Sequence, residues 1–261
     1  MAETTMSVSY IVPVWREDTY AGICKPWIDK QVEEYGAELI EVRGSKSIFQ
    51  ALERGRRQAL NQYLFYVHDD VRLLSPDNLT PQIIKAFEDF PRTGLIGPVG
   101  KINSDIVPWW KNTGRHVGHY CRRDEQDNII YRCTTRSGAI FSRNFSRVQG
   151  EVWDKFAKAG LVDGFFLAED RGRVNTPWDL SAFGENWHGY DADRCYQTRK
   201  LGFEVMVSPW LFLHDNAGHK GYKGTQDKEA HINKFKTAGD KHWLSDLEAA
   251  NVALRSKWGL A

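Results

Sequence analysis

The feature that most constrains the fold is a continuous apolar run near the start of the chain, SVSYIVPVW at residues 7–15. It is rich in β-branched residues, which is typical of a strand buried on both faces of a sheet. Two similar runs follow, ELIEVR at 38–43 and YLFYVH at 63–68. Between the last two, residues 47–62 carry apolar side chains on one helical face. Strands that alternate with helices predict a mostly parallel sheet with right-handed crossovers.

The rest of the chain predicts one domain with an elaborated second half. No linker rich in Pro or Ser interrupts its 261 residues, so a single α/β domain is expected. In order, the pattern predicts a helix near 79–90, a short strand at 94–100, loops and hairpins over 101–150, a strand at 162–168, a helix at 187–202, two short strands split by Pro209 at 203–215, and helical structure over 227–256.

Composition and charge narrow the class of protein. The net charge is +1, which gives no general case for a nucleic acid or a membrane partner. No apolar run approaches the ~20 residues that span a bilayer, and the first residues lack the regions of a signal peptide. Cys24, Cys121, Cys133 and Cys195 form no closely spaced pair, which favours reduced thiols over a structural zinc site. We therefore expect a cytoplasmic protein.

The strand at 63–68 ends in an acidic cluster, His68, Asp69 and Asp70. In open parallel sheets, ligands bind outside the carboxyl ends of the strands. On an extended chain His68 and Asp70 point to the same side and Asp69 to the other. A histidine and a carboxylate that face together predict a divalent-metal site. Acids that cap a turn or the next helix explain the stretch equally well, so both interpretations stay open here.

Five motifs in order resemble glycosyltransferases of the GT-A fold, family 2-like group: YIVPVW, HDDV, VDGFFLA, GYDADRCYQTRKLGFEV and LFLHD. The subgroup with a His-x-Asp-Val metal motif is the most similar. The resemblance covers residues 7–215 and is poor over 103–160. It implies a GT-A type, Rossmann-like, mostly parallel sheet flanked by helices. Within a single domain, 1–261, it implies a nucleotide-sugar-binding half at about 7–100, an acceptor and catalytic half at about 101–226 and a C-terminal helical segment at about 227–261.

The resemblance also implies a metal-dependent reaction. The DXD-like motif of the family holds Mn²⁺ or Mg²⁺ on the diphosphate of a nucleotide sugar, with a UDP-sugar as the expected donor. It places Asp70 on the metal, His68 at the usual first aspartate, and His214 as a metal-proximal histidine. A divalent cation neutralises the charge of the diphosphate as it leaves. The alternative for His214 is a hydrogen-bonded histidine at a strand end.

The stretch GYDADRC resembles the Glu-Asp motif that begins a helix in this family. The second member, the catalytic base of inverting enzymes, falls on Asp191, and Tyr190 takes the place of the usual glutamate. A base must be ionised and within hydrogen-bond reach of the acceptor hydroxyl. A helix N-terminus favours the ionised carboxylate. Simple helix capping is the alternative role for Asp191, and Asp193 is expected to be structural.

Donor-binding positions follow from the same resemblance. Glycine lets the backbone approach a ligand, although a glycine in a strand also marks a bulge. A Gly-rich loop near a diphosphate can act as a lid, and an ordinary solvated loop is the alternative. The implied positions are Pro13 and Val14 under the nucleotide base, Glu41 and Arg43 near the base or ribose, Asp69 in the acidic motif, Asp163 and Gly164 beside the donor sugar, and Lys220 and Lys223 on the lid.

The chemical class of the acceptor is predicted from the charge of one stretch of the sequence. Residues 111–147 hold eight basic and three acidic side chains, on a chain whose net charge is +1. A basic stretch with aromatic residues nearby predicts an anionic acceptor, either a phosphorylated glycan or lipid or phage-type DNA with a hydroxylated base. A solvated basic face is the alternative.

Two other functions compete with a glycosyltransferase. A nucleotidyltransferase also combines a nucleotide, a metal ion and a parallel sheet, but it needs a Gly-rich phosphate loop after the first strand. The stretch PVWREDTY has no glycine there. A non-catalytic carbohydrate- or nucleotide-binding protein is the other candidate, and the paired Asp70 and Asp191 argue against it.

Overall fold

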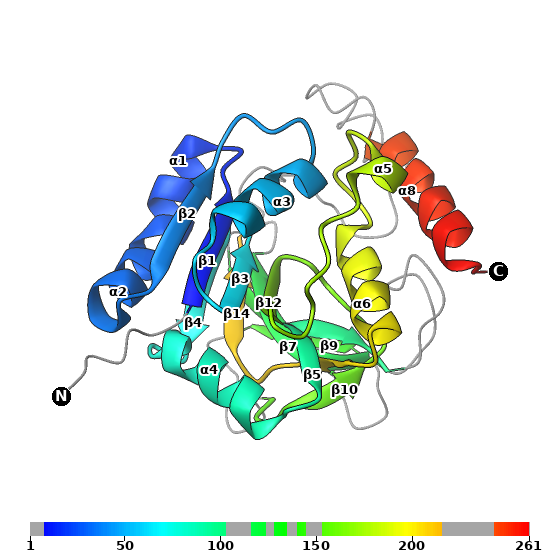
Figure 1. Ribbon diagram of the computed structural model, residues 1–261. Coiled ribbons are helices and arrows are strands. Elements are labelled where there is room, and N and C mark those ends of the chain that lie inside the picture. Colours follow the sequence, from blue (N-terminus) through cyan, green and yellow to red (C-terminus); the bar gives the residue numbers. More distant parts are fainter. Residues whose placement is uncertain are drawn as a thin grey trace.

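The computed structural model describes residues 8–102, 116–123, 128–134, 140–144, 153–215 and 243–260. The predictions for Lys220 and Lys223, and the helical structure expected before residue 243, lie outside these residues. Helices and strands alternate through the first half as expected, and α8 lies at the opposite end of the molecule from α2 (Figure 1). Within the described part of the chain, no helix is long and apolar enough to cross a membrane.

The elements agree with the predicted pattern along most of the chain. In chain order they are β1 (Val8–Pro13), α1 (Glu17–Thr19), the π-helical turn η1 (Tyr20–Cys24), α2 (Lys25–Tyr35), β2 (Glu38–Val42), α3 (Ile48–Gln58), β3 (Tyr63–Val67), β4 (Val71–Ser75), α4 (Leu79–Asp89), β5 (Thr93–Gly97), β6 (Val99–Lys101), β7 (His116–Arg123), β8 (Ile129–Thr134), β9 (Ile140–Asn144), β10 (Ala157–Ala159), β11 (Leu161–Val162), β12 (Phe166–Asp170), α5 (Leu180–Phe183), α6 (Tyr190–Lys200), β13 (Glu204–Val207), β14 (Leu211–His214) and α8 (Trp243–Trp258).

The main sheet has seven strands in the order β10-β13-β5-β12-β3-β1-β2. β1 pairs in parallel with β2 and β3, and β13 with β5. β12 lies antiparallel between β3 and β5, and β10 is antiparallel to β13. The sheet is therefore mixed, with as many antiparallel as parallel pairings, where a mostly parallel sheet was expected. The described elements between β5 and β12 are all strands, so none of them is a crossover helix that would return the chain to the sheet in the parallel direction.

Helices cover both faces of the main sheet. The alternation of β1 sends Tyr10 toward α2, where it contacts Trp27, and Ile11 toward α3. A Cβ atom on Gly55 of α3 would lie 2.2 Å from the Cγ2 of Ile11, so this helix can sit on β1 only with a glycine there. Every residue of β1 is buried, as the continuous apolar run predicts. The layered α/β architecture expected from the sequence is confirmed.

A second sheet packs beside the first and brings two distant segments together. Its order is β11-β6-β7-β14-β4, with β8 on β7 and β9 on β8. β14 is parallel to β7 and antiparallel to β4. The prediction of loops and hairpins over 101–150 is confirmed in the described residues, where β7, β8 and β9 form an antiparallel meander. Because β3 belongs to the main sheet and β4 to the second, residues 68–70 lie where the chain passes between the two.

The predicted strand at 162–168 is broken in the middle. β11 ends at Val162 and β12 begins at Phe166. The carboxylate of Asp163 accepts a hydrogen bond from the backbone N–H of Phe165 at 3.2 Å, the local bond by which Asp favours turns. The break leaves Asp163 and Gly164 in a turn beside the carboxyl end of β3, where the N–H of His68 donates to the carbonyl of Phe165 at 3.0 Å.

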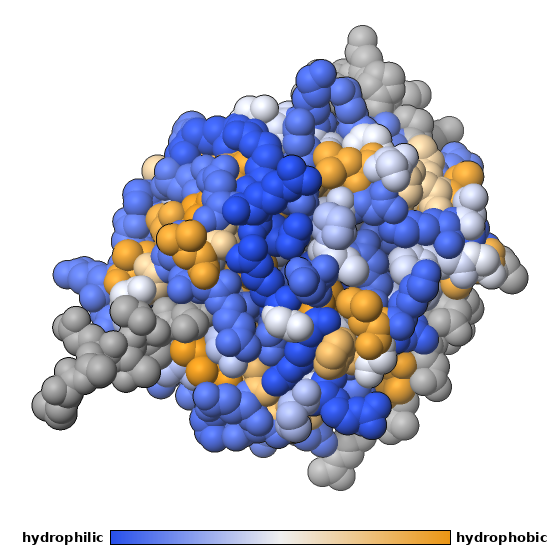
Figure 2. Space-filling model, viewed as in Figure 1, coloured by the Kyte–Doolittle hydropathy of each residue, from blue (hydrophilic) through white to orange (hydrophobic). Residues whose placement is uncertain are grey.

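The surface is mixed, and its most hydrophilic band lies over α3 (Figure 2). α3 ends in two arginines, Arg56 and Arg57, which both pair with the buried Glu53. Large apolar side chains are exposed only singly among the described residues, Trp15 and Leu60 being the most exposed. Single exposed apolar residues are normal on a protein surface. Trp15 is taken up below, because it lies next to the candidate active site.

Candidate active site

Three predicted metal ligands lie together at the junction of the two sheets. His68 and Asp70 follow β3. His214 is the last residue of β14 and pairs with Val71 of β4. One ligand atom from each of these residues lies within 4.8 Å of the others. Two ligands of one ion at a bond length of about 2.2 Å are at most about 4.4 Å apart. The group, called the His68–Asp70–His214 group below, is thus compact enough for a single ion after a small shift.

Asp70 is the charged centre of this group. Its Oδ2 atom accepts from the guanidinium of Arg16 at 3.3 Å, and its Oδ1 atom lies 3.3 Å from the Nε2 of His214. Oδ1 is buried and accepts no hydrogen bond. Burial alone would raise the pKa of Asp70, but the histidines and Arg16 outweigh it, so the pKa is lowered and the carboxylate is ionised.

The pKa values of the two histidines shift in opposite directions. Burial, assisted by the neighbouring His214, lowers the pKa of His68 to about 4, so its ring is neutral. Burial also lowers the pKa of His214, but Asp70 acts in the opposite direction and more strongly, and the net pKa is raised. Phe165 stacks on the His214 ring at 4.8 Å between centroids. A neutral imidazole is the form that binds metal ions, so His68 is ready for this role without losing a proton.

Tyr190 holds the His68 ring. Its phenolic oxygen lies 2.7 Å from Nε2 of His68, which leaves Nδ1 of His68 without this constraint. Metal-binding histidines usually bond a second group through the other ring nitrogen, which fixes the ring and its tautomer. The contact depends on Gly164, because a Cβ atom there would lie 2.4 Å from the Tyr190 oxygen. Gly164 therefore makes room for a protein side chain, and a role for it in sugar binding stays a prediction.

Asp69 points away from the His68–Asp70–His214 group, as alternation predicts. Its Oδ2 atom accepts hydrogen bonds from the backbone N–H groups of Trp15 and Arg16, both at 2.8 Å. Burial raises the pKa of Asp69, and these two bonds act against the rise. The carboxylate therefore fixes the loop after β1 against the end of β3. Asp69 therefore caps neither a local turn nor the next helix, the alternative that the sequence left open, and instead holds a distant loop.

Asp191 begins α6 and lies near the other acids of the site. The helix starts at Tyr190, and Oδ1 of Asp191 accepts from the N–H of Ala192 at 2.8 Å. The pKa of Tyr190 is raised, first by burial and then by the charges of Asp191, Asp163 and Asp70. One phenol thus has all three carboxylates in its surroundings. The structure places the predicted base at the same edge of the main sheet as the predicted metal ligands.

The predicted base-binding residues lie beside β1 and β2. Pro13 and Val14 line a small depression together with Trp15 and Trp187, whose rings are 4.7 Å apart between centroids. Trp15 is 67% exposed, so part of its side chain is open to a ligand.

Glu41 and Arg43 bond each other and residues of α1 and η1. Arg43 donates to Glu41 at 2.7 Å and to Glu17 at 2.5 Å, and Tyr20 donates to Glu41 at 2.5 Å. They lie at the expected strand end, and their contact with a nucleotide stays a prediction.

Sequence reasoning did not assign three residues that the structure places at the site: Arg16, Tyr190 and Trp15. Tyr190 had a signal, because it occupies the glutamate position of the family motif next to Asp191. Arg16 and Trp15 follow the first strand directly, and carboxyl ends of strands are where ligands bind. Their partners, Asp69 and Asp70, lie more than fifty residues away, so pairing was beyond the reach of local patterns.

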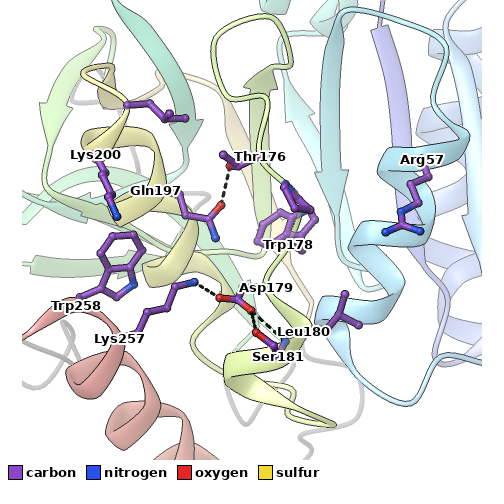
Figure 3. A pocket seen from close by; sticks show the side chains of 12 residues that line it. Arg57, Thr176, Trp178, Asp179, Leu180, Ser181, Gln197, Lys200, Lys257 and Trp258 are labelled. Atoms are coloured by element: carbon purple, nitrogen blue, oxygen red, sulfur yellow. Dashed lines mark hydrogen bonds and ion pairs between the residues drawn. The ribbon is translucent and has the colours of Figure 1, made fainter.

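A separate cavity lies away from this site. It has a volume of about 630 Å³ and lies between α5, α6 and α8 (Figure 3). Lys257 points into it and pairs with Asp179 at 2.8 Å, and Thr176 bonds Gln197 at 2.9 Å. None of the residues predicted from sequence for donor, metal or catalysis lines it. Of the charged side chains that line it, Lys257 and Asp179 are paired with each other. The chemistry of the His68–Asp70–His214 group therefore decides the site, and the size of the cavity does not.

Comparison with protein families gives a direct match. The description "Glycosyltransferase like family" applies to the sequence model that matches residues 10–236. This range covers most of the chain and includes every residue of the His68–Asp70–His214 group, as well as Asp191. The chain belongs to this family, and its enzyme class is glycosyltransferase. No curated protein sequence matches the chain.

Solved structures show only distant likeness. One is GalNAc-T7 with UDP, GalNAc and Mn²⁺, at 11% identity and a TM-score of 0.44; the match covers 93% of this chain and 50% of that one. Another is the mannosyltransferase PcManGT from Pyrobaculum calidifontis with GDP-Man and Mn²⁺, at 15% identity and a TM-score of 0.46, covering 98% and 76%. The chain thus spans half the length of the GalNAc-T7 structure. Likeness at this level carries no argument about activity.

Proposed function

We propose that this protein is a metal-dependent, inverting glycosyltransferase that moves a sugar from a nucleotide-diphosphate sugar to an acceptor hydroxyl. The observation that carries the proposal is the His68–Asp70–His214 group, with the unbonded Oδ1 of Asp70 at the edge of the sheet where ligands bind in such folds. Family membership gives the reaction class, and the site gives residues with which to carry it out.

The chain's own residues divide the work. Asp70, His68 and His214 would hold the divalent cation, which neutralises the departing diphosphate when bound. Two imidazoles beside one carboxylate favour Mn²⁺ over Mg²⁺, because Mg²⁺ prefers oxygen ligands. Tyr190 keeps the His68 ring in place. Arg16 balances the charge of Asp70 from the side opposite His214.

Asp191 would take the proton of the acceptor hydroxyl. Its position in the first turn of α6 favours the ionised form, and its nearness to Tyr190 brings it to the same pocket edge as Asp70. The acceptor oxygen, which loses its proton to this base, would form a bond to the anomeric carbon on one side while the bond from that carbon to the diphosphate oxygen breaks on the other. This single displacement inverts the anomeric carbon. Asp163 is buried nearby, and burial raises the pKa of its carboxyl. It is the second candidate for the base, because only the ionised form of a carboxyl can accept the proton.

A screen of nucleotide sugars tests the proposal. UDP- and GDP-sugars are incubated with the protein and Mn²⁺, and release of the nucleoside diphosphate is followed with and without EDTA. Metal-dependent hydrolysis that disappears in Asp70→Asn supports the proposal. Hydrolysis that persists in excess EDTA, or nucleotide binding without any turnover across the screen, would instead favour a metal-free enzyme or a binding protein.

The acceptor belongs to this proposal as well. A glycan, or DNA with a hydroxylated base, is expected from the basic stretch at 111–147, of which residues 116–123, 128–134 and 140–144 are described. If the acceptor is a polyanion, its binding should weaken steeply with salt because bound phosphates release counterions. A salt-insensitive acceptor affinity would leave a neutral glycan.

A further inference from the structure

One face of the second sheet is turned toward the His68–Asp70–His214 group. In the parallel pair of β14 and β7, His214 is the partner of Arg122, and in the antiparallel pair of β7 and β8, Tyr120 is the partner of Arg132. Paired residues share a face of a sheet, as do residues two apart in one strand. His214, Arg122, Tyr120 and Arg132 therefore project from the same face.

Side-chain contacts along this face agree with the register. Phe165 stacks on His214, and the ring of Tyr120 lies 5.7 Å from that of Phe165. The guanidinium of Arg132 donates to the Tyr120 oxygen at 2.9 Å. β7, β14 and β12 lie close together in the middle of the molecule (Figure 1). A continuous row thus leads from His214 to Arg132.

The two arginines on this face lack carboxylate partners among the described residues. The Nε atoms of Arg122 and Arg132 are buried and form no hydrogen bond. Arg123, the next residue of β7, projects from the opposite face and bonds Asp215 at 2.8 Å. Burial raises the pKa of the Tyr120 phenol, both arginines act against this rise, and Asp163 adds to it. Neither arginine forms an ion pair with a described residue. Partly buried cations without an anion are costly, and a bound anion would remove that cost.

We propose that Arg122 and Arg132 form a binding site for a phosphoryl group next to the His68–Asp70–His214 group. A guanidinium presents a planar fork of N–H donors that matches phosphate oxygens in pairs. Neighbouring strands are about 4.8 Å apart, so both arginines can reach one phosphoryl group from adjacent strands. Whether this group is the diphosphate of the donor or a phosphate on the acceptor rests on the proposed function; the binding of phosphate itself does not.

The first test uses inorganic pyrophosphate without metal or sugar, at constant ionic strength. Its dissociation constant is measured by calorimetry for the wild type, Arg122→Gln and Arg132→Gln, with Arg72→Gln as the matched control. Arg72 pairs with Leu213 across β4 and β14 and so lies on the opposite face of the same sheet. The dissociation constant should rise about tenfold or more in the first two variants, because charge-assisted hydrogen bonds are lost, and stay unchanged in the control.

Stability separates binding from a structural role. Without ligand, Arg122→Gln should unfold at the wild-type temperature or above it, because a cation without a partner is removed. Pyrophosphate should raise the unfolding temperature of the wild type but not of this variant. Unchanged pyrophosphate binding in both variants, or an equal loss in Arg72→Gln, would overturn the proposal.

A second measurement identifies the source of the phosphoryl group. If it is the donor, UDP and GDP bind more weakly to Arg122→Gln in the presence of Mn²⁺, and uridine does not. If it is the acceptor, nucleoside diphosphate binding is unchanged, and inorganic phosphate still binds to protein saturated with UDP and Mn²⁺ in an Arg122-dependent way. Asp70→Asn should keep metal-free pyrophosphate binding, so a failure of the glycosyltransferase proposal would show separately.

Discussion

Two buried charged clusters in this protein are built in opposite ways. Arg194 and Glu169 are both fully buried, and the guanidinium donates to both carboxylate oxygens at 2.6 and 2.7 Å. Arg194 also donates to the carbonyl of Thr176 and the side chain of Gln197, and lies over the Trp178 ring at 4.7 Å. This cluster is saturated from within the protein, which is typical of a structural role.

The cluster around Asp70 is incomplete. It is also buried, but one carboxylate oxygen accepts no hydrogen bond and two imidazoles face it. Arg122 and Arg132 extend the same condition along the neighbouring strands. Burial alone therefore does not identify a functional group, whereas a buried charged group with an atom that forms no hydrogen bond among the described residues indicates a ligand.

Asp70→Asn should have the largest effect. Metal-dependent transfer is expected to fall by about 10³-fold or more, because the charge stabilisation that a cation supplies is worth several kcal/mol. Initial rates and Mn²⁺ binding by calorimetry provide the measurement. Asp77→Asn, an exposed residue after β4, is the matched control and should be unaffected. Wild-type rates in Asp70→Asn would remove the ligand interpretation of the incomplete cluster.

Asp191→Asn should lower turnover by ~10²–10⁴-fold, since loss of a general base typically costs this much. Donor binding should be nearly unchanged, which calorimetry with UDP and Mn²⁺ can check. NMR of the product from an α-linked donor should show inverted configuration. A retained configuration would take the base role from Asp191; an inverted product with a fully active variant would move the base to another group, with Asp163 as the next candidate.

Glu169→Gln tests the saturated cluster. Removing one member of a buried pair leaves the other charge uncompensated and typically costs about 3–5 kcal/mol in free energy of unfolding. Chemical denaturation measures it. Glu204→Gln, which breaks surface pairs with Lys158 and Arg92, should cost less than about 1 kcal/mol. Equal costs in the two variants would show that the saturated cluster is not a special element of stability.

Tyr190→Phe tests whether α6, which carries Asp191, also positions the predicted metal ligand His68. It removes the bond to Nε2 of His68 while keeping the ring. Mn²⁺ affinity, measured without substrate, should fall by about 10- to 100-fold, as is usual when an outer partner of a ligand is lost. Tyr35→Phe at the end of α2 is the control. An unchanged Mn²⁺ affinity with normal folding would show that Tyr190 does not position His68 for metal.

The smallest effect is expected at Asp179, in the cavity of Figure 3. Burial raises its pKa, but Lys257 and local hydrogen bonds lower it more, to about 2. Because the folded pKa is depressed, the carboxylate stabilises the fold above its unfolded pKa of about 3.9, and this contribution disappears as the pH falls toward 2. Asp179→Asn should therefore cost less than about 1 kcal/mol near neutral pH and nothing near pH 2. Denaturation at both pH values checks this, and a pH-independent difference would contradict it.

Much of the fold follows from local sequence patterns. The buried strand at 7–15, the helix after Ser47 and the two strands split by Pro209 all appear where the pattern predicts them, because apolar periodicity and turn chemistry are local properties. The side chain of Ser47 accepts from the N–H of Gln50, as an N-cap does. The predicted parallel order failed at β12, because pairing direction depends on how the chain returns to the sheet.

Local patterns alone place two acids and a histidine at the end of the third strand and Asp191 at the start of a helix. The use of these side chains depends on contacts that form only in the folded protein. Asp69 accepts hydrogen bonds from the backbone of residues 15 and 16. Asp70 lies beside His214, which is distant in the sequence, and its Oδ1 atom accepts no hydrogen bond. The physical reason is that strand alternation fixes the side to which a residue points, whereas its partners come from segments that only the packing of two sheets brings together.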